Sequence, residues 1–191
     1  IVHASEELKG NKDIIMFAIE NSGRYILEYA SQNLRGNKEV VMAAVKKNGY
    51  ALDDASLNLQ DDKEVVMAAV METGEAIQFA SSKLKDLRDF VMETMRTCGG
   101  CLEYLSDKFK DDKEVVLTAV KKNGLALGYA SVRLQDDKEV VLTAVKENGR
   151  ALGYASVRLQ DNEEVVLTAV QATGRALEYA SVSCLLYTSD A

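Results

Sequence analysis

The chain has 191 residues and a formal net charge of −7. This acidic balance argues against nucleic acid and anionic membrane surfaces as partners, because proteins that bind either one need a basic face. An apolar content of 47% is typical of a folded protein, yet no apolar run approaches the roughly 20 residues that cross a bilayer.

A repeat of 25 residues organises the chain. The stretch from Lys113 to Asp137 is followed at once by a near copy over residues 138–162, and the two copies differ at only three positions. An acidic residue opens the apolar run of each copy, and these residues are spaced by 26 positions once and by 25 thereafter. They are Asp13, Glu39, Glu64, Asp89, Glu114, Glu139 and Glu164. With a half-copy at residues 1–10, the spacing predicts an all-α fold, an α-solenoid of about seven and a half helix–turn–helix repeats.

A single repeat array is expected over residues 1–182, because the chain has no proline and no linker-like stretch. Residues 183–191 abandon the repeat, and the octet CLLYTSDA that begins at Cys184 resembles a translated sequencing adaptor. We set this tail aside, as one would a cloning scar. The chain does not begin with Met, so we expect a fragment from environmental sequencing, and a signal peptide upstream of Ile1 stays open.

Each copy is predicted to begin with a helix that starts at the acidic residue. The run VVLTAV at residues 115–120 covers an arc of roughly 200° on a 3.6-residue period, which fits a helix held between the neighbouring copies. Asp or Asn precedes the run, as at Asp112 and Asn162, where an N-cap is expected. A strand is the alternative, since leucine-rich repeats have similar periods. The helix is favoured, because the run does not alternate and the leucine-rich signature is absent.

A glycine follows each first helix and is predicted to turn the chain. We expect a residue just past the helix end in the left-handed backbone region, where a side chain is costly. These structural glycines are Gly23, Gly49, Gly74, Gly99, Gly124, Gly149 and Gly174. Gly128 and Gly153 differ from them, because other copies carry Glu, Gln or Asp there, and we expect both to tolerate a side chain.

A second helix of about two turns, LALGYA in the copy opened by Glu114, is predicted to end at a recurrent serine. Two structural roles stay open for the serine, which either caps a following one-turn helix or bonds back to a carbonyl. A role as nucleophile would need a nearby base, and the only histidine is His3. The structural serines are Ser31, Ser56, Ser81, Ser106, Ser131, Ser156 and Ser181.

An aromatic residue holds one slot of the second helix in most copies. Packing against the next copy is the favoured interpretation, since aromatic bulk usually serves the core. The alternative is a ladder of stacking platforms that binds a ligand along one face. His3 and Asp54 stand in the same slot, which indicates that it reaches water. The candidate binding ladder comprises Tyr29, Phe79, Tyr104, Tyr129, Tyr154 and Tyr179.

Cys98 and Cys101 form a CxxC motif that could be a redox pair or half a zinc site. A zinc site needs four ligands, and the remaining cysteine is Cys184 in the tail. We favour small side chains in the slots that other copies fill with Asn or Thr and with Ala. Three cysteines make no disulfide framework, which favours a reducing, intracellular compartment.

Acidic pairs such as Asp111 and Asp112 suggest calcium as another alternative. They lack the alternating ligands and central glycine of an EF-hand loop, and N-cap chemistry explains them. We therefore expect no metal site, no cofactor and no catalytic residue.

The blocks DDKEVV, AVxxNG and ALxYAS recur together at a fixed spacing and resemble the repeat family catalogued as domain of unknown function 4116. The resemblance covers residues 1–182. It implies a helical repeat segment without an assigned activity, and it offers no catalytic residues. The fourth copy departs most, with RDFVMETM, CGGC and Leu105 in place of the usual alanine.

We expect a non-enzymatic scaffold that binds an unknown protein or peptide through an extended face, by analogy with other solenoids. The alternative is a passive spacer or targeting arm of a larger protein whose catalytic domain lies outside this chain. An enzyme is disfavoured, because no acid–base–nucleophile constellation is present. One position between the two helices differs from copy to copy while the residues around it recur, which favours a binding array over a spacer. It holds Tyr50, Glu75, Leu125, Arg150 and Arg175.

Overall fold

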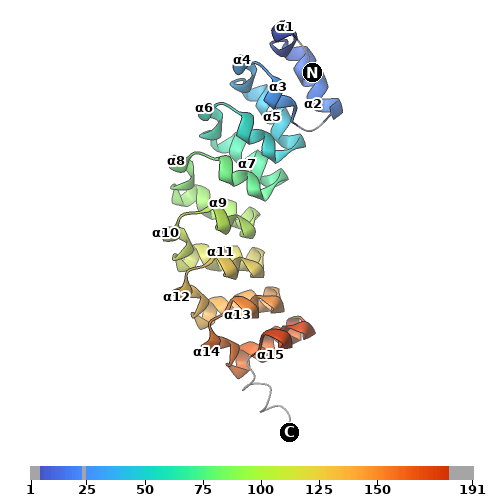
Figure 1. Cartoon of the computed structure of the whole chain (residues 1–191). Helices are drawn as coiled ribbons and strands as arrows, with labels where there is room; N and C mark the ends of the chain where they lie inside the picture. The colour runs from blue at the N-terminus through green and yellow to red at the C-terminus, as the bar shows by residue number, and fades with distance from the viewer. Residues whose placement is uncertain (1–4, 23–24, 181–191) are drawn as a thin grey trace. The chain divides into compact units, whose positions relative to one another are not determined.

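The computed structural model describes residues 5–22 and 25–180 (Figure 1). These residues are helical with no strand among them, which confirms the all-α solenoid class. Gly23, Ser181 and the tail at residues 183–191 lie outside the described residues. The chain forms two compact units, residues 1–90 and 91–191, and the division between them falls within one helix, α9 (Arg88–Thr97).

The repeats opened by Glu39, Glu64, Asp89, Glu114 and Glu139 each contain three helical elements, where the sequence predicted two and left a third open. In these repeats a longer α-helix comes first, a 3₁₀-helix of six residues follows, and a single α-helical turn completes the repeat. The longer helices are α2 (Lys12–Ser22), α5 (Lys38–Lys47), α7 (Lys63–Glu72), α9, α11 (Lys113–Lys122), α13 (Lys138–Glu147) and α15 (Glu163–Ala172). The 3₁₀-helices are η1 (Gly49–Asp54), η2 (Gly74–Phe79), η3 (Gly99–Tyr104), η4 (Gly124–Tyr129), η5 (Gly149–Tyr154) and η6 (Gly174–Tyr179). The single turns are α1 (Glu6–Lys9), α4 (Gln32–Arg35), α6 (Leu57–Gln60), α8 (Ser82–Lys85), α10 (Asp107–Lys110), α12 (Val132–Gln135) and α14 (Val157–Gln160).

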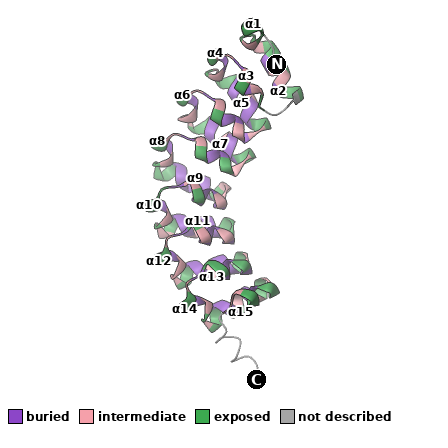
Figure 2. Cartoon of the chain, in the orientation of Figure 1, coloured by how far each residue is buried: buried purple, intermediate pink, exposed green. Residues whose placement is uncertain are grey.

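The longer helices begin where the sequence predicts. The Asp112 side chain accepts hydrogen bonds from the backbone N–H groups of Glu114 and Val115, at 3.0 and 3.2 Å, which confirms the N-cap. Along α11, Val115, Val116, Ala119 and Val120 are buried (Figure 2). The helix packs against α13 and also against η3 and η4, as expected for a helix held between neighbours.

The second helix has the predicted two turns but is of the tighter 3₁₀ kind. In η4 the backbone of Asn123 is extended, with φ at −150°, and its side chain accepts a hydrogen bond from the N–H of Leu125 at 3.1 Å. Gly124, Leu127 and Ala130 are all buried. A spacing of three matches the three residues per turn of a 3₁₀-helix, so these positions share one face.

The glycine that opens each 3₁₀-helix does not serve as predicted. Gly49, Gly99, Gly124, Gly149 and Gly174 do not have a left-handed backbone, so the prediction is wrong at these positions. A Cβ on Gly124 would instead lie 2.4 Å from the carbonyl oxygen of Ala144 and 3.0 Å from the backbone N of Asn148, both in the next repeat. The same clash arises at Gly49, Gly99 and Gly149. Glycine is needed because the last turn of the following longer helix touches its backbone.

The extra residue of the first repeat changes the local helix. Tyr25 has a left-handed backbone with φ at 58°, and it precedes an α-helical turn, α3 (Ile26–Tyr29), where later repeats have a 3₁₀-helix. The neighbouring residues 23–24 lie outside the described part. The left-handed residue Tyr25 thus lies in the one repeat that has 26 residues and not 25.

The recurrent serines join neighbouring repeats. The N–H of Ser131 donates to the carbonyl of Lys110 at 2.8 Å, and its hydroxyl donates to the carboxylate of Asp111. The same hydroxyl accepts from the N–H of Leu134, so it caps α12, which was one of the two open roles. Arg133 Nε also lies 3.0 Å from Asp111 Oδ1. The contacts with Lys110 and Asp111 cross the boundary between two repeats, and the bond from Leu134 fixes the start of α12.

These carboxylates predict sensitivity to acid. Hydrogen bonds from Ser131 and then from Arg133 hold the pKa of Asp111 below its ordinary 3.8, and Ser156 and Arg158 do the same to Asp136. Because the folded pKa is depressed, the stabilisation is present above the unfolded pKa and is lost as pH falls through the folded pKa. We therefore expect the melting temperature to fall as the pH drops below about 4. Replacing both carboxylates, Asp111→Asn with Asp136→Asn, should make that fall shallower, and an unchanged slope in thermal melts would contradict the assignment.

Candidate functional site

The 3₁₀-helices place the aromatic column on the surface. In the second unit η4 packs on η5 and η5 packs on η6, so their tyrosines follow at one-repeat spacing. Tyr129 is 38% exposed and Tyr154 is 48% exposed, whereas Tyr104 and Tyr179 are half-buried. In the first unit Tyr29 and Phe79 are half-buried. The rings therefore pack between repeats and still reach water, as the sequence indicates for this slot.

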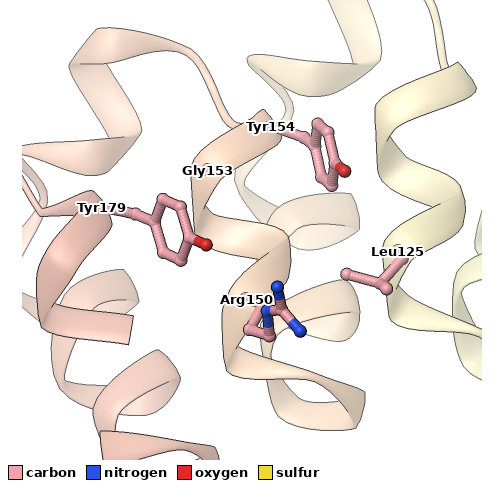
Figure 3. A pocket seen from close by; sticks show the side chains of 5 residues that line it. All are labelled: Leu125, Arg150, Gly153, Tyr154 and Tyr179. Carbon is pink, nitrogen blue, oxygen red and sulfur yellow. The ribbon is translucent and has the colours of Figure 1, made fainter. Parts of the chain in front are cut away.

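A shallow pocket of about 200 Å³ lies in this surface. Leu125, Arg150, Gly153, Tyr154 and Tyr179 line it, from η4, η5 and η6. Figure 3 shows the guanidinium of Arg150 and the hydroxyl of Tyr179 directed toward the same space, with Tyr154 and Leu125 on the other side. The pocket thus offers two flat apolar rings, one aliphatic side chain, one cation and hydroxyl groups, which is chemistry suited to binding.

Two glycines set the positions of the tyrosine rings. A Cβ on Gly153 would lie 2.8 Å from Tyr179 Cδ1, and a Cβ on Gly128 would lie 3.0 Å from Tyr154 Cδ1. Each ring therefore rests against the glycine of the preceding repeat. Side chains at these glycines, expected from the sequence to be tolerated, require the rings to move.

One repeat earlier, a carboxylate stands in the place of these glycines. Glu103 is the counterpart of Gly128 and Gly153. Partial burial, and then the nearby Glu103 carboxylate, raise the pKa of Tyr129 above its ordinary value. In the first unit the hydroxyl of Tyr50 donates to the carboxylate of Glu75. A tyrosine hydroxyl and a carboxylate thus lie close together in both units, although Glu75 and Glu103 hold different positions of the repeat.

Cys98 and Cys101 are joined by a disulfide, which corrects the expectation of two separate small side chains. Their slots are as predicted, because Cys98 stands where Asn123 caps η4, and Cys101 is buried in η3. The turn brings residues three apart onto one face, with the two Cα atoms 5.5 Å apart, within the range that a disulfide spans.

The acidic residues at the starts of the longer helices serve as caps and ion pairs. Lys113 Nζ lies 2.8 Å from Asp137 and 2.8 Å from Glu139 of the next repeat. Within the described part of the chain, no group of three or more His, Cys, Asp or Glu side chains is arranged to hold a metal ion. None of the helices described there has the length and apolar character needed to cross a membrane.

Comparison with protein families identifies the repeat. A family model described as Domain of unknown function (DUF4116) matches residues 1–35, 37–85, 88–135 and 137–184. The chain belongs to this family. Each of the last three DUF4116 matches spans about two of the 25-residue repeats. Comparisons with curated proteins and with solved structures found no match to the chain.

In these DUF4116 repeats, sequence reasoning found part of the pocket. Tyr154 and Tyr179 belong to the predicted aromatic column, and Leu125 and Arg150 hold the variable position noted beside it. Gly153 was singled out only for tolerance of a side chain. The available signal was that Arg150 and Gly153 are three residues apart, which places them on one face of a 3₁₀-helix.

Proposed function

We propose that this DUF4116 array is a non-enzymatic scaffold that binds a protein or peptide segment through the face of η4, η5 and η6. The observation that supports it is the pocket lined by Arg150, Tyr154 and Tyr179. Tyr and Arg are the residue types most enriched among side chains that dominate binding energy, since they supply large flat contacts and directed hydrogen bonds. The 3₁₀-helices that carry the pocket residues are anchored in the core, with Leu127 and Leu152 fully buried.

The test replaces the pocket rings while keeping their apolar bulk. Peptides selected from a random displayed library against the whole chain serve as ligands. A double variant, Tyr154→Leu with Tyr179→Leu, should bind them at least tenfold more weakly, which is about 1.4 kcal/mol. Its melting temperature should change little, since both rings are partly exposed. Isothermal titration calorimetry measures the affinities.

A matched control lies on the one-turn helices. Val132 and Val157 are 81% and 76% exposed and do not line the pocket. A double Val→Ser variant at these positions should bind the selected peptides like the unmodified chain. Recovery of no peptide would favour a passive spacer or targeting arm, and equal binding by the tyrosine double variant would place the binding surface outside this pocket.

A further inference from the structure

Two carboxylates on the face of the 3₁₀-helices in the second unit lie near an arginine or a tyrosine of the chain itself. The first relation lies within one repeat, where Arg175 Nε is 3.1 Å from Oε1 of Glu178, three residues later in η6. The second relation joins successive repeats, where burial and then the Glu103 carboxylate of η3 raise the pKa of the Tyr129 hydroxyl in η4. Glu178 and Glu103 hold equivalent positions of their repeats. One acidic position therefore serves either an arginine of its own repeat or a tyrosine of the next.

Gly153 holds that position in η5, where both contacts are missing. Arg150 precedes it by three residues, as Arg175 precedes Glu178, and Tyr179 follows in the next repeat, as Tyr129 follows Glu103. Among the described residues the structure gives neither the Arg150 guanidinium nor the Tyr179 hydroxyl a carboxylate partner. The two groups instead face the open pocket that Gly153 also lines (Figure 3).

We infer that this pocket accepts the carboxylate of an aspartate or glutamate side chain from a bound peptide segment. The ligand's carboxylate takes the place that Glu103 and Glu178 occupy in their repeats, between the guanidinium of Arg150 and the hydroxyl of Tyr179. The rings of Tyr154 and Tyr179 and the side chain of Leu125 contact the apolar neighbours of the acidic residue. This inference rests on the proposed binding function and adds the chemistry of the partner.

The surrounding charge explains why the acid must come within a peptide. The whole chain carries a net charge of −7, so a free anion is repelled at long range. An exposed ion pair by itself contributes little to affinity, whereas a charge-assisted hydrogen bond beside apolar contacts contributes more. Specificity for a carboxylate therefore comes from Arg150 and Tyr179, and most of the affinity comes from the rings and Leu125.

The experiment selects random linear peptides, displayed without a free carboxyl terminus, against the whole chain and against its Arg150→Gln variant. We expect Asp or Glu to be enriched at one peptide position with the unmodified chain and not with Arg150→Gln. The best peptide, synthesised with both termini blocked, should bind about five- to tenfold more tightly than its Glu→Gln analogue. Replacement of Tyr179 by Phe should reduce that preference.

The matched control is Arg175→Gln, because Arg175 is already paired with Glu178. It removes the same charge one repeat away and should leave the preference for the acidic peptide intact. Equal loss in both arginine variants would show a general charge effect and overturn the assignment. Peptides selected without acidic enrichment would overturn the carboxylate inference and leave the binding function standing. Failure to select any peptide would overturn both.

Discussion

Replacing Gly124 by alanine is expected to lower the free energy of unfolding by about 2–3 kcal/mol. The added Cβ would lie 2.4 Å from the carbonyl oxygen of Ala144, and that oxygen is already the acceptor for the N–H of Asn148. Neither backbone group can move without separating two packed repeats. Valine at the same position should cost more, because it adds two further methyl groups to the same contact. Urea unfolding followed by circular dichroism measures the difference.

Gly174 provides the matched control for this substitution. It opens η6 as Gly124 opens η4, yet a Cβ there meets nothing within 4 Å among the described residues. Gly174→Ala should therefore be neutral or slightly stabilising, because alanine restricts the unfolded chain more than glycine does. Equal losses at Gly124 and Gly174 would mean that local backbone conformation, and not contact with the next repeat, decides the residue.

Truncating Leu127 to alanine is expected to cost about 3 kcal/mol, the largest effect of a single core truncation that we predict. Leu127 is fully buried in η4, where the longer helices α11 and α13 both pack against the 3₁₀-helix. Removal of its isobutyl group leaves a cavity that the rigid helices on either side can fill only in part.

Leu177 is the counterpart of Leu127 in η6 and is 44% exposed. Leu177→Ala should cost roughly 1 kcal/mol or less, because an exposed side chain gives up little buried area. Chemical denaturation of the two variants tests the difference directly. Similar losses would show that packing between repeats contributes less to stability than the structure indicates.

Several features of the fold could be predicted from the sequence because their causes are local. Asp112 caps the helix that begins at the next residue, and the cap needs only backbone groups two and three positions away. The wide apolar arc of residues 115–120 likewise indicates that α11 has neighbours on more than one side, as the structure shows. Because the repeat copies these short-range signals at a constant interval, the all-α class followed from them.

The type of the second helix was harder to predict. Burial of Gly124, Leu127 and Ala130 at a spacing of three is a 3₁₀ signal, but an α-helix of two turns has a similar pattern over so short a span. The disulfide between Cys98 and Cys101 depends on that choice, because it forms where the 3₁₀ turn brings the two residues together.

The sequence by itself determined the period, the caps, the longer helices and the family, since each of these depends on residues that are close together along the chain. Only the tertiary structure decided why Gly124 is glycine, because the atom that excludes a side chain belongs to Ala144, in the next repeat. It also decided where a ligand can bind. Arg150 and Tyr179 lie 29 positions apart in the sequence, and they face one pocket because η5 packs on η6.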